Sequence, residues 1–110
     1  MLYIENNLVY EKTDTSTHIK IVHYCNVNNL QLTVAHNIIT AEYQIFDLEE
    51  SKYIIDTNIN KNVDIYVNNE NLGQLEIIEG IGQFEFESEE NGTFKIRIEN
   101  REVIVNVENH

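Results

Sequence analysis

The chain has 110 residues, of which 42% are hydrophobic and 24% are charged, which fits one folded domain with a modest core and excludes a disordered chain. Its formal net charge is -12 at pH 7. Such a surface repels phosphate and anionic lipid, so we expect neither a nucleic acid nor a membrane as its partner.

Cys25 is the only cysteine, which excludes an intrachain disulfide and a metal site built on two cysteines. Residues 1–7 contain no basic region followed by a long apolar run, so we expect no signal peptide and synthesis in a cytoplasm, with a virion as one destination. No stretch approaches the roughly 18 continuous apolar residues that a membrane-spanning helix needs.

Residues 1–29 are predicted to form a hairpin and one further strand. Apolar residues at 2–4 and 8–10 flank Glu5-Asn6-Asn7, which is interpreted as the connection of the hairpin. Polar residues 11–17 are interpreted as a linker, and residues 19–25 as a strand. That strand is apolar on both faces, so it needs a covering partner.

Residues 30–34 and 39–46 alternate between apolar and polar side chains, which predicts two strands. A helix over residues 40–53 is the alternative, because apolar residues there also fall at helical spacing. The β-branched and aromatic content of this segment favours the strand. An extra short strand is expected around residues 53–55.

The alternation is clearest in the C-terminal half. It predicts strands at residues 63–67, 75–77, 84–86, 94–98 and 103–107. The intervening segments 68–73, 79–82, 89–92 and 99–101 are rich in Asn, Gly and Glu and are interpreted as turns. Strands separated by turns at intervals of about ten residues are typical of a sandwich or barrel.

The order of these segments resembles bacterial and phage immunoglobulin-like domains over about residues 30 to 107. The resemblance rests on residues 39–47, the segment 63–73, and two short motifs: Gly82-Gln83-Phe84-Glu85-Phe86 and Gly92-Thr93-Phe94-Lys95-Ile96. Phe94 stands where such domains often carry a corner tyrosine, and residues 48–62 are longer than the usual compact turn. The resemblance implies a recognition or assembly role, as in adhesins, capsid decorations and tails, rather than turnover.

We therefore expect an all-β chain forming one domain. An immunoglobulin-like antiparallel β-sandwich would occupy residues 30–110, and an N-terminal hairpin or arm with an edge strand would occupy residues 1–29.

The residues that could carry chemistry form no diagnostic pattern. A metal site could be built only from His18, His23 and His36, joined by Glu42 or Asp47. The spacing of these histidines is not characteristic of a metal site. Cys25 is interpreted as a buried thiol, and the acidic run Glu85, Glu87, Glu89 and Glu90 as a solvated face that lacks the spacing of a calcium loop. We expect no enzyme, no catalytic residue, no metal site and no cofactor.

A protein partner is the expectation that remains: further copies of the chain in a homo-oligomer, or other subunits of a phage or prophage particle. The residues predicted to bind it are Tyr3, Tyr10, Ile19, Ile21, Val22, Tyr24 and Tyr66. One alternative is an acidic inhibitor that binds a basic host protein and mimics DNA, motivated by the net charge. Another is a carbohydrate-binding module that uses outward tyrosines such as Tyr66, although packing between strands is the favoured role of that residue.

Overall fold

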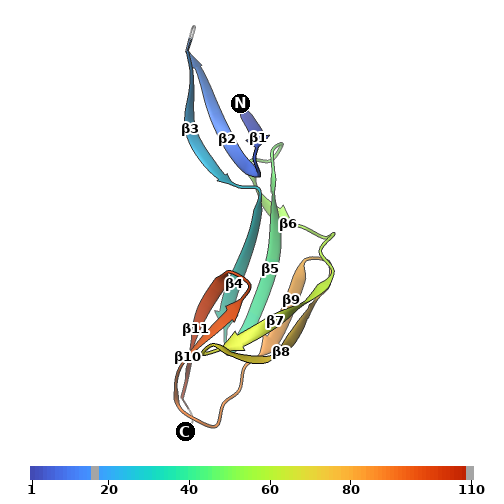
Figure 1. The fold of residues 1–110 in the computed structure, drawn as a ribbon, viewed down its shortest axis with the longest axis vertical. Helices are drawn as coiled ribbons and strands as arrows, with labels where there is room; N and C mark the ends of the chain where they lie inside the picture. Colours follow the sequence, from blue (N-terminus) through green and yellow to red (C-terminus); the bar gives the residue numbers. More distant parts are fainter. Residues whose placement is uncertain (16–17, 109–110) are drawn as a thin grey trace. The chain divides into compact units, whose positions relative to one another are not determined.

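The computed structural model describes residues 1–15 and 18–108, apart from the side chains of residues 14–23. Every regular element of the described chain is a β-strand (Figure 1). In chain order the strands are β1 (Leu2–Glu5), β2 (Leu8–Thr15), β3 (His18–Asn26), β4 (Asn28–Ala35), β5 (Ile38–Asp47), β6 (Lys52–Ile55), β7 (Lys61–Val67), β8 (Glu70–Ile77), β9 (Ile81–Glu85), β10 (Gly92–Ile98) and β11 (Arg101–Val107).

The prediction of an all-β fold is confirmed for the described residues. Residues 40–46 belong to strand β5, so the strand interpretation of that segment holds and the helical alternative is wrong. The described residues contain no helix of the length and apolarity that a membrane crossing requires.

The chain forms two compact units. Unit 1 comprises Met1–Asn29 and Gln44–Ile54, and unit 2 comprises Leu30–Tyr43 and Ile55–His110. The first division therefore falls between residues 29 and 30. The segment 44–54, which the sequence analysis includes in the sandwich, belongs to unit 1.

Unit 1 contains a three-stranded antiparallel sheet in the order β1-β2-β3. Asn6 and Asn7, both with positive φ, form the two-residue turn that joins β1 to β2. The predicted linker at residues 11–17 is wrong in its first five residues, because β2 continues to Thr15; Ser16 and Thr17 lie outside the described residues. Residues 11–15 lack apolar alternation, and backbone pairing with β3 is what makes them a strand.

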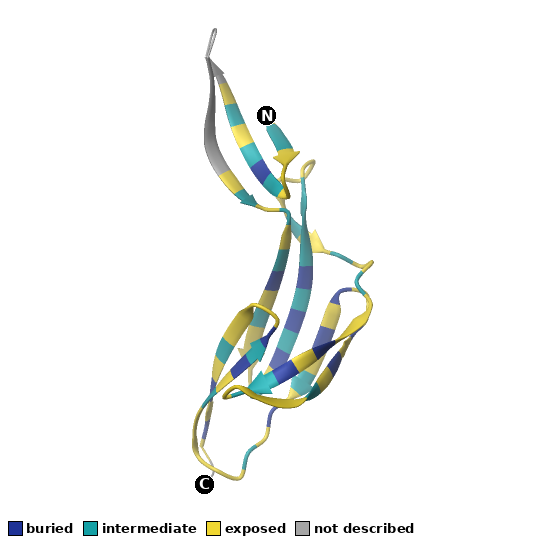
Figure 2. Cartoon of the chain, viewed as in Figure 1, coloured by how far each residue is buried: buried dark blue, intermediate teal, exposed yellow. Residues whose placement is uncertain are grey.

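Unit 2 is a β-sandwich. One sheet has the order β11-β10-β7-β8, and in the other β5 pairs with β4 and, through Ile38–Glu42, with β9. Inward residues from both sheets form the core, so buried and exposed positions alternate along the strands (Figure 2). The buried core residues are Leu30, Ile39, Ala41, Tyr43, Val63, Ile65, Leu75, Ile77, Phe86, Ile96, Ile98, Val105 and Val107.

The turns of unit 2 again use asparagine. His36-Asn37 joins β4 to β5, Asn68-Asn69 joins β7 to β8, and all four residues have positive φ. The predicted turn at residues 68–73 is therefore shorter than expected, because β8 begins at Glu70. Asparagine suits these positions since its side chain tolerates the left-handed region better than most.

Gly80 directly precedes β9, and its backbone hydrogen bonds hold the chain in place there. Its N–H donates to the Ile59 carbonyl at 2.9 Å, and its carbonyl accepts from the N–H of Tyr43 at 2.8 Å. The residue has a φ of 87°, and a Cβ placed on it would lie 2.5 Å from the Asp56 carbonyl oxygen. Only glycine fits this close passage without strain.

Candidate functional site

Three tyrosines form a row across the sheet of unit 1. Tyr10 on β2 lies directly opposite Tyr3 on β1 and directly opposite Tyr24 on β3. The ring centroids of Tyr3 and Tyr10 are 5.1 Å apart with an interplanar angle of 18°, and those of Tyr10 and Tyr24 are 6.1 Å apart at 36°. We call this row the tyrosine ladder; such aromatic pairs between neighbouring strands stabilise a sheet.

The face that carries the ladder is described here as the ladder face. Among the residues with described side chains, alternation along the three strands places these on it: Tyr3, Glu5, Leu8, Tyr10, Lys12, Tyr24 and Asn26. The Lys12 ammonium nitrogen lies 4.1 Å from the centroid of the Tyr3 ring, a cation–π contact. Tyr24 is 63% exposed, and Tyr3 and Tyr10 are partly exposed. The ladder face is thus an accessible aromatic surface.

Desolvation of the phenol, then the nearby Glu5 carboxylate and Tyr10, raise the pKa of Tyr3. The Tyr3 hydroxyl therefore keeps its proton throughout the physiological range, because an ordinary phenol already has a pKa near 10. A protonated phenol donates as well as accepts a hydrogen bond. At Tyr3, the ladder face consequently offers a neutral hydroxyl group to a partner.

Unit 1 has little core of its own. Val9, on the face opposite the ladder, is its only buried hydrophobic residue among the described side chains, and Ile4 beside it is 48% exposed. Cys25 pairs with Val9 and is half-buried, whereas the sequence analysis expects a buried thiol. A sheet with so small a core gains stability from any surface that covers it.

The remaining segments of unit 1 attach to the end of the sheet. The Val27 N–H donates to the Asn7 carbonyl at 3.0 Å, and the Val27 carbonyl accepts from the Phe46 N–H at 2.8 Å. The Tyr53 ring packs edge-on against Phe46, and its hydroxyl donates to the Asn26 carbonyl. These contacts attach β5 and β6 to the C-terminal end of β3.

Three other predicted partner-binding residues, Ile19, Ile21 and Val22, have side chains outside the description. Their backbones lie in β3, where Ile19 pairs with Asp14 and Ile21 with Lys12. Val22 is the additional residue of a β-bulge, since the next pair is His23 with Glu11. The bulge shifts the register between the two ends of β3.

Tyr66 lies on β7 in unit 2 and does not belong to the ladder. It stands opposite Arg97 of β10, whose guanidinium carbon is 4.3 Å from the ring centroid. Arg97 also donates to the Glu99 carbonyl at 3.1 Å. Packing between strands is thus the observed role of this side chain, at the border of an open hollow of about 330 Å³.

Tyr43 is a feature that sequence patterns miss. The ring is 8% exposed, and the Lys61 ammonium lies 4.8 Å from its centroid. Lys61 also forms an ion pair with Glu99 at 2.9 Å. Burial first, and then the nearby Glu99 carboxylate, raise the pKa of Tyr43; among the described residues, none stands in hydrogen-bonding geometry to its hydroxyl. Only tertiary packing brings these groups together.

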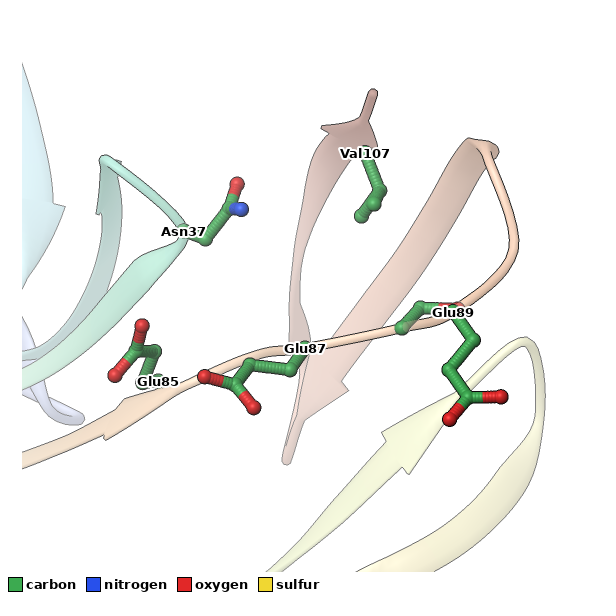
Figure 3. A pocket seen from close by; sticks show the side chains of 6 residues that line it. Asn37, Glu85, Glu87, Glu89 and Val107 are labelled. Atoms are coloured by element: carbon green, nitrogen blue, oxygen red, sulfur yellow. The ribbon is translucent and has the colours of Figure 1, made fainter. Parts of the chain in front are cut away.

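An acidic hollow of about 520 Å³ lies beside the end of β9. It is lined by Glu85, Glu87 and Glu89, together with Asn37, Ser88 and Val107. The three carboxylates are spread along the segment and do not converge on one point (Figure 3). Among the described residues, no group of three or more His, Cys, Asp or Glu side chains is placed to hold a metal ion.

The predicted metal residues are distributed accordingly. His36 occupies the β4–β5 turn of unit 2, whereas the side chains of His18 and His23 lie outside the description. Glu42 belongs to unit 2 and Asp47 to unit 1.

Comparison of the chain with protein-family models, curated proteins and solved structures gave no match. The class that the fold defines is an all-β protein with a sandwich unit and a three-stranded unit.

Proposed function

We propose that the chain is a non-enzymatic interaction and assembly module in which the ladder face of unit 1 binds a protein. The observation that carries this proposal is the exposed tyrosine ladder on a sheet with a single described buried hydrophobic residue. Tyrosine gives a large, rigid contact at low entropic cost and is enriched where proteins bind one another.

The distribution of charge supports the same surface. Residues 1–29 hold three acidic and two basic residues, whereas residues 30–110 hold sixteen acidic and five basic residues. Charged residues are depleted at the centre of protein interfaces. The part of the chain that carries the ladder is therefore the part best suited to contact another protein without strong repulsion.

Ring orientation favours a protein over a carbohydrate. Sugars bind aromatic side chains by lying on open ring faces, but Tyr3 stacks on Tyr10, Tyr24 is tilted against Tyr10, and Lys12 covers part of Tyr3. Ring edges and hydroxyls are what this row offers to a partner. Edges and hydroxyls suit the mixed apolar and polar contacts of a protein interface.

The acidic inhibitor remains a second candidate, and the acidic surplus of residues 30–110 supports it. Such an inhibitor would bind through the surface of unit 2 rather than through the ladder. Its binding would weaken steeply as salt is added.

The strand order of unit 2 supports an immunoglobulin-like sandwich as part of this proposal. Strands β4, β5, β7, β8, β9, β10 and β11 correspond in chain order to strands A, B, C, C′, E, F and G. This correspondence puts A, B and E in one sheet and C′, C, F and G in the other. Together with the sequence resemblance, it favours a component of a phage or prophage particle.

A photo-cross-linking experiment in the producing cell tests the proposal. A benzophenone amino acid replaces Tyr24, which is 63% exposed, and in a matched control it replaces Leu72 of β8, which is 58% exposed. We expect discrete protein adducts from position 24 and far fewer from position 72. Equal yields at the two positions, or adducts from position 72 alone, would contradict the proposal.

A further inference from the structure

The two charged residues described on the ladder face have backbone positions on either side of the tyrosine ladder. Glu5 is opposite Leu8, and Lys12 is four residues further along β2, with the tyrosine ladder between them. At about 3.4 Å per residue, the backbone positions of Glu5 and Lys12 are about 14 Å apart along the strand direction. They form no ion pair with each other, and neither has an ion-pair partner among the described side chains; the Lys12 ammonium leans back over the Tyr3 ring.

This arrangement is complementary to itself. Consider a second copy that faces the first across a two-fold axis. The axis lies between the two sheets and runs along the row of tyrosines, across the strands. The strands of the two sheets then run in opposite directions. The Glu5 end of each copy then meets the Lys12 end of the other, and the tyrosines meet in the middle. Closed two-fold contacts of this kind are the commonest form of homo-oligomer.

The charge of the whole chain favours this contact over others between copies. Two chains of net charge -12 repel each other wherever their acidic surfaces meet. Among the residues with described side chains, the ladder face holds one carboxylate and one ammonium group, so these parts of two faces can approach without that cost. It also holds the largest described aromatic row, whose contact area would become buried.

We propose that two copies of this chain bind each other through their ladder faces, in antiparallel orientation, so that Glu5 of each copy pairs with Lys12 of the other. This inference rests on the proposed function, because it names the partner of the same surface. The packing is that of two stacked sheets, with interleaved side chains between them.

A charge-swap cycle on the purified full chain tests the pairing. Sedimentation equilibrium would measure the dimer dissociation constant of the wild type and of Glu5→Lys, Lys12→Glu and the double variant Glu5→Lys/Lys12→Glu. Each single change places like charges together twice per dimer, so we expect each to weaken the dimer about tenfold. The double change restores opposite charges at both contacts, so its dissociation constant should return to within about threefold of the wild type.

Glu11→Lys is the matched control. Glu11 is exposed on the opposite face of β2, next to Lys12 in sequence, and reversal of its charge should leave the dimer intact. Circular dichroism of each variant separates a lost contact from a lost fold. Failure of the double variant to recover, with its fold intact, overturns the antiparallel pairing.

The outcomes also separate this inference from the proposed function. A chain that stays monomeric at its highest soluble concentration, yet gives adducts of other masses from position 24 in the cell, overturns the self-pairing and leaves the binding surface in place. A chain that stays monomeric and gives no adduct from position 24 overturns both.

Discussion

The Tyr53 hydroxyl donates a hydrogen bond to the backbone carbonyl of Asn26, across 27 positions of the sequence. This bond and the edge-on contact with Phe46 attach β6 to the end of β3 within unit 1. A unit with so little core depends on such individual contacts more than the sandwich does.

Tyr53→Phe removes this bond and retains the ring. We expect unit 1 to lose about 1 kcal/mol of local stability, because the Asn26 carbonyl loses its donor. Amide hydrogen exchange at Val27, whose backbone bonds lie beside Asn26, should accelerate severalfold. Tyr24→Phe, which removes a hydroxyl with no such described bond, is the control; the same acceleration in both variants would argue against the assignment.

Gly80→Ala should destabilise unit 2 more than Gly82→Ala. A Cβ at position 80 meets the backbone oxygen of Asp56 at 2.5 Å and also occupies a φ of 87°. At position 82 the 2.5 Å neighbour is the end of the Ile77 side chain, which can move. We expect a loss of about 2 to 4 kcal/mol for Gly80→Ala and about half of that for Gly82→Ala, measured by urea unfolding. The reverse order would show that side-chain crowding outweighs backbone strain here.

The raised pKa of Tyr43 predicts that the stability of unit 2 decreases at alkaline pH. Burial and the Glu99 carboxylate raise the folded-state pKa of Tyr43 above the ordinary value of 10.0. The folded state therefore holds this proton where the unfolded state has released it, so stability should fall as the pH rises above about 10.

Tyr43→Phe checks the same residue in two ways. The decline above pH 10 should become shallower, and stability at pH 7 should be unchanged or higher, because the buried hydroxyl that disappears has no hydrogen-bond partner in the described structure. A loss of more than about 1 kcal/mol at pH 7 would show that the hydroxyl contributes a stabilising interaction.

In the β7–β8 turn, glycine substitutions at the neighbouring Asn68 and Asn69 should change stability by different amounts. Asn69 has a φ of 71°, so Asn69→Gly should be nearly neutral, whereas Asn69→Val should cost about 1 to 2 kcal/mol through backbone strain. Asn68 also accepts the Lys95 N–H with its side-chain oxygen at 2.9 Å, so Asn68→Gly should lose about 1 kcal/mol. Thermal unfolding of the three variants gives the comparison, and equal effects of the two glycine changes would contradict it.

Much of unit 2 could be predicted from the sequence. Strands such as β7 and β10 bury alternate residues, and the alternation of Val63 and Ile65, or of Ile96 and Ile98, records that burial directly. The C-terminal part of β2 could not be predicted in this way. Its residues are held by backbone bonds to β3, and backbone bonds leave no apolar pattern in the sequence.

In the tyrosine ladder, the pair Tyr3–Tyr10 could be predicted from the sequence, but the pair Tyr10–Tyr24 could not. A two-residue turn at Asn6-Asn7 places Tyr3 opposite Tyr10, because both stand three residues from the turn. The pairing of Tyr10 with Tyr24 depends on the bulge at Val22, which shifts the register of β3 by one residue. No local signal in the sequence marks that bulge, so its consequence appears only in the folded chain.

Sedimentation equilibrium of the wild type and of Tyr10→Ser/Tyr24→Ser, over a wide range of concentrations, addresses the ladder most directly. For the wild type, the mass should rise with concentration from 12.9 kDa toward twice that value, while the variant stays at 12.9 kDa with its sandwich folded. A wild type that remains at 12.9 kDa throughout, or a variant that associates as strongly as the wild type, would contradict the self-association assigned to these rings.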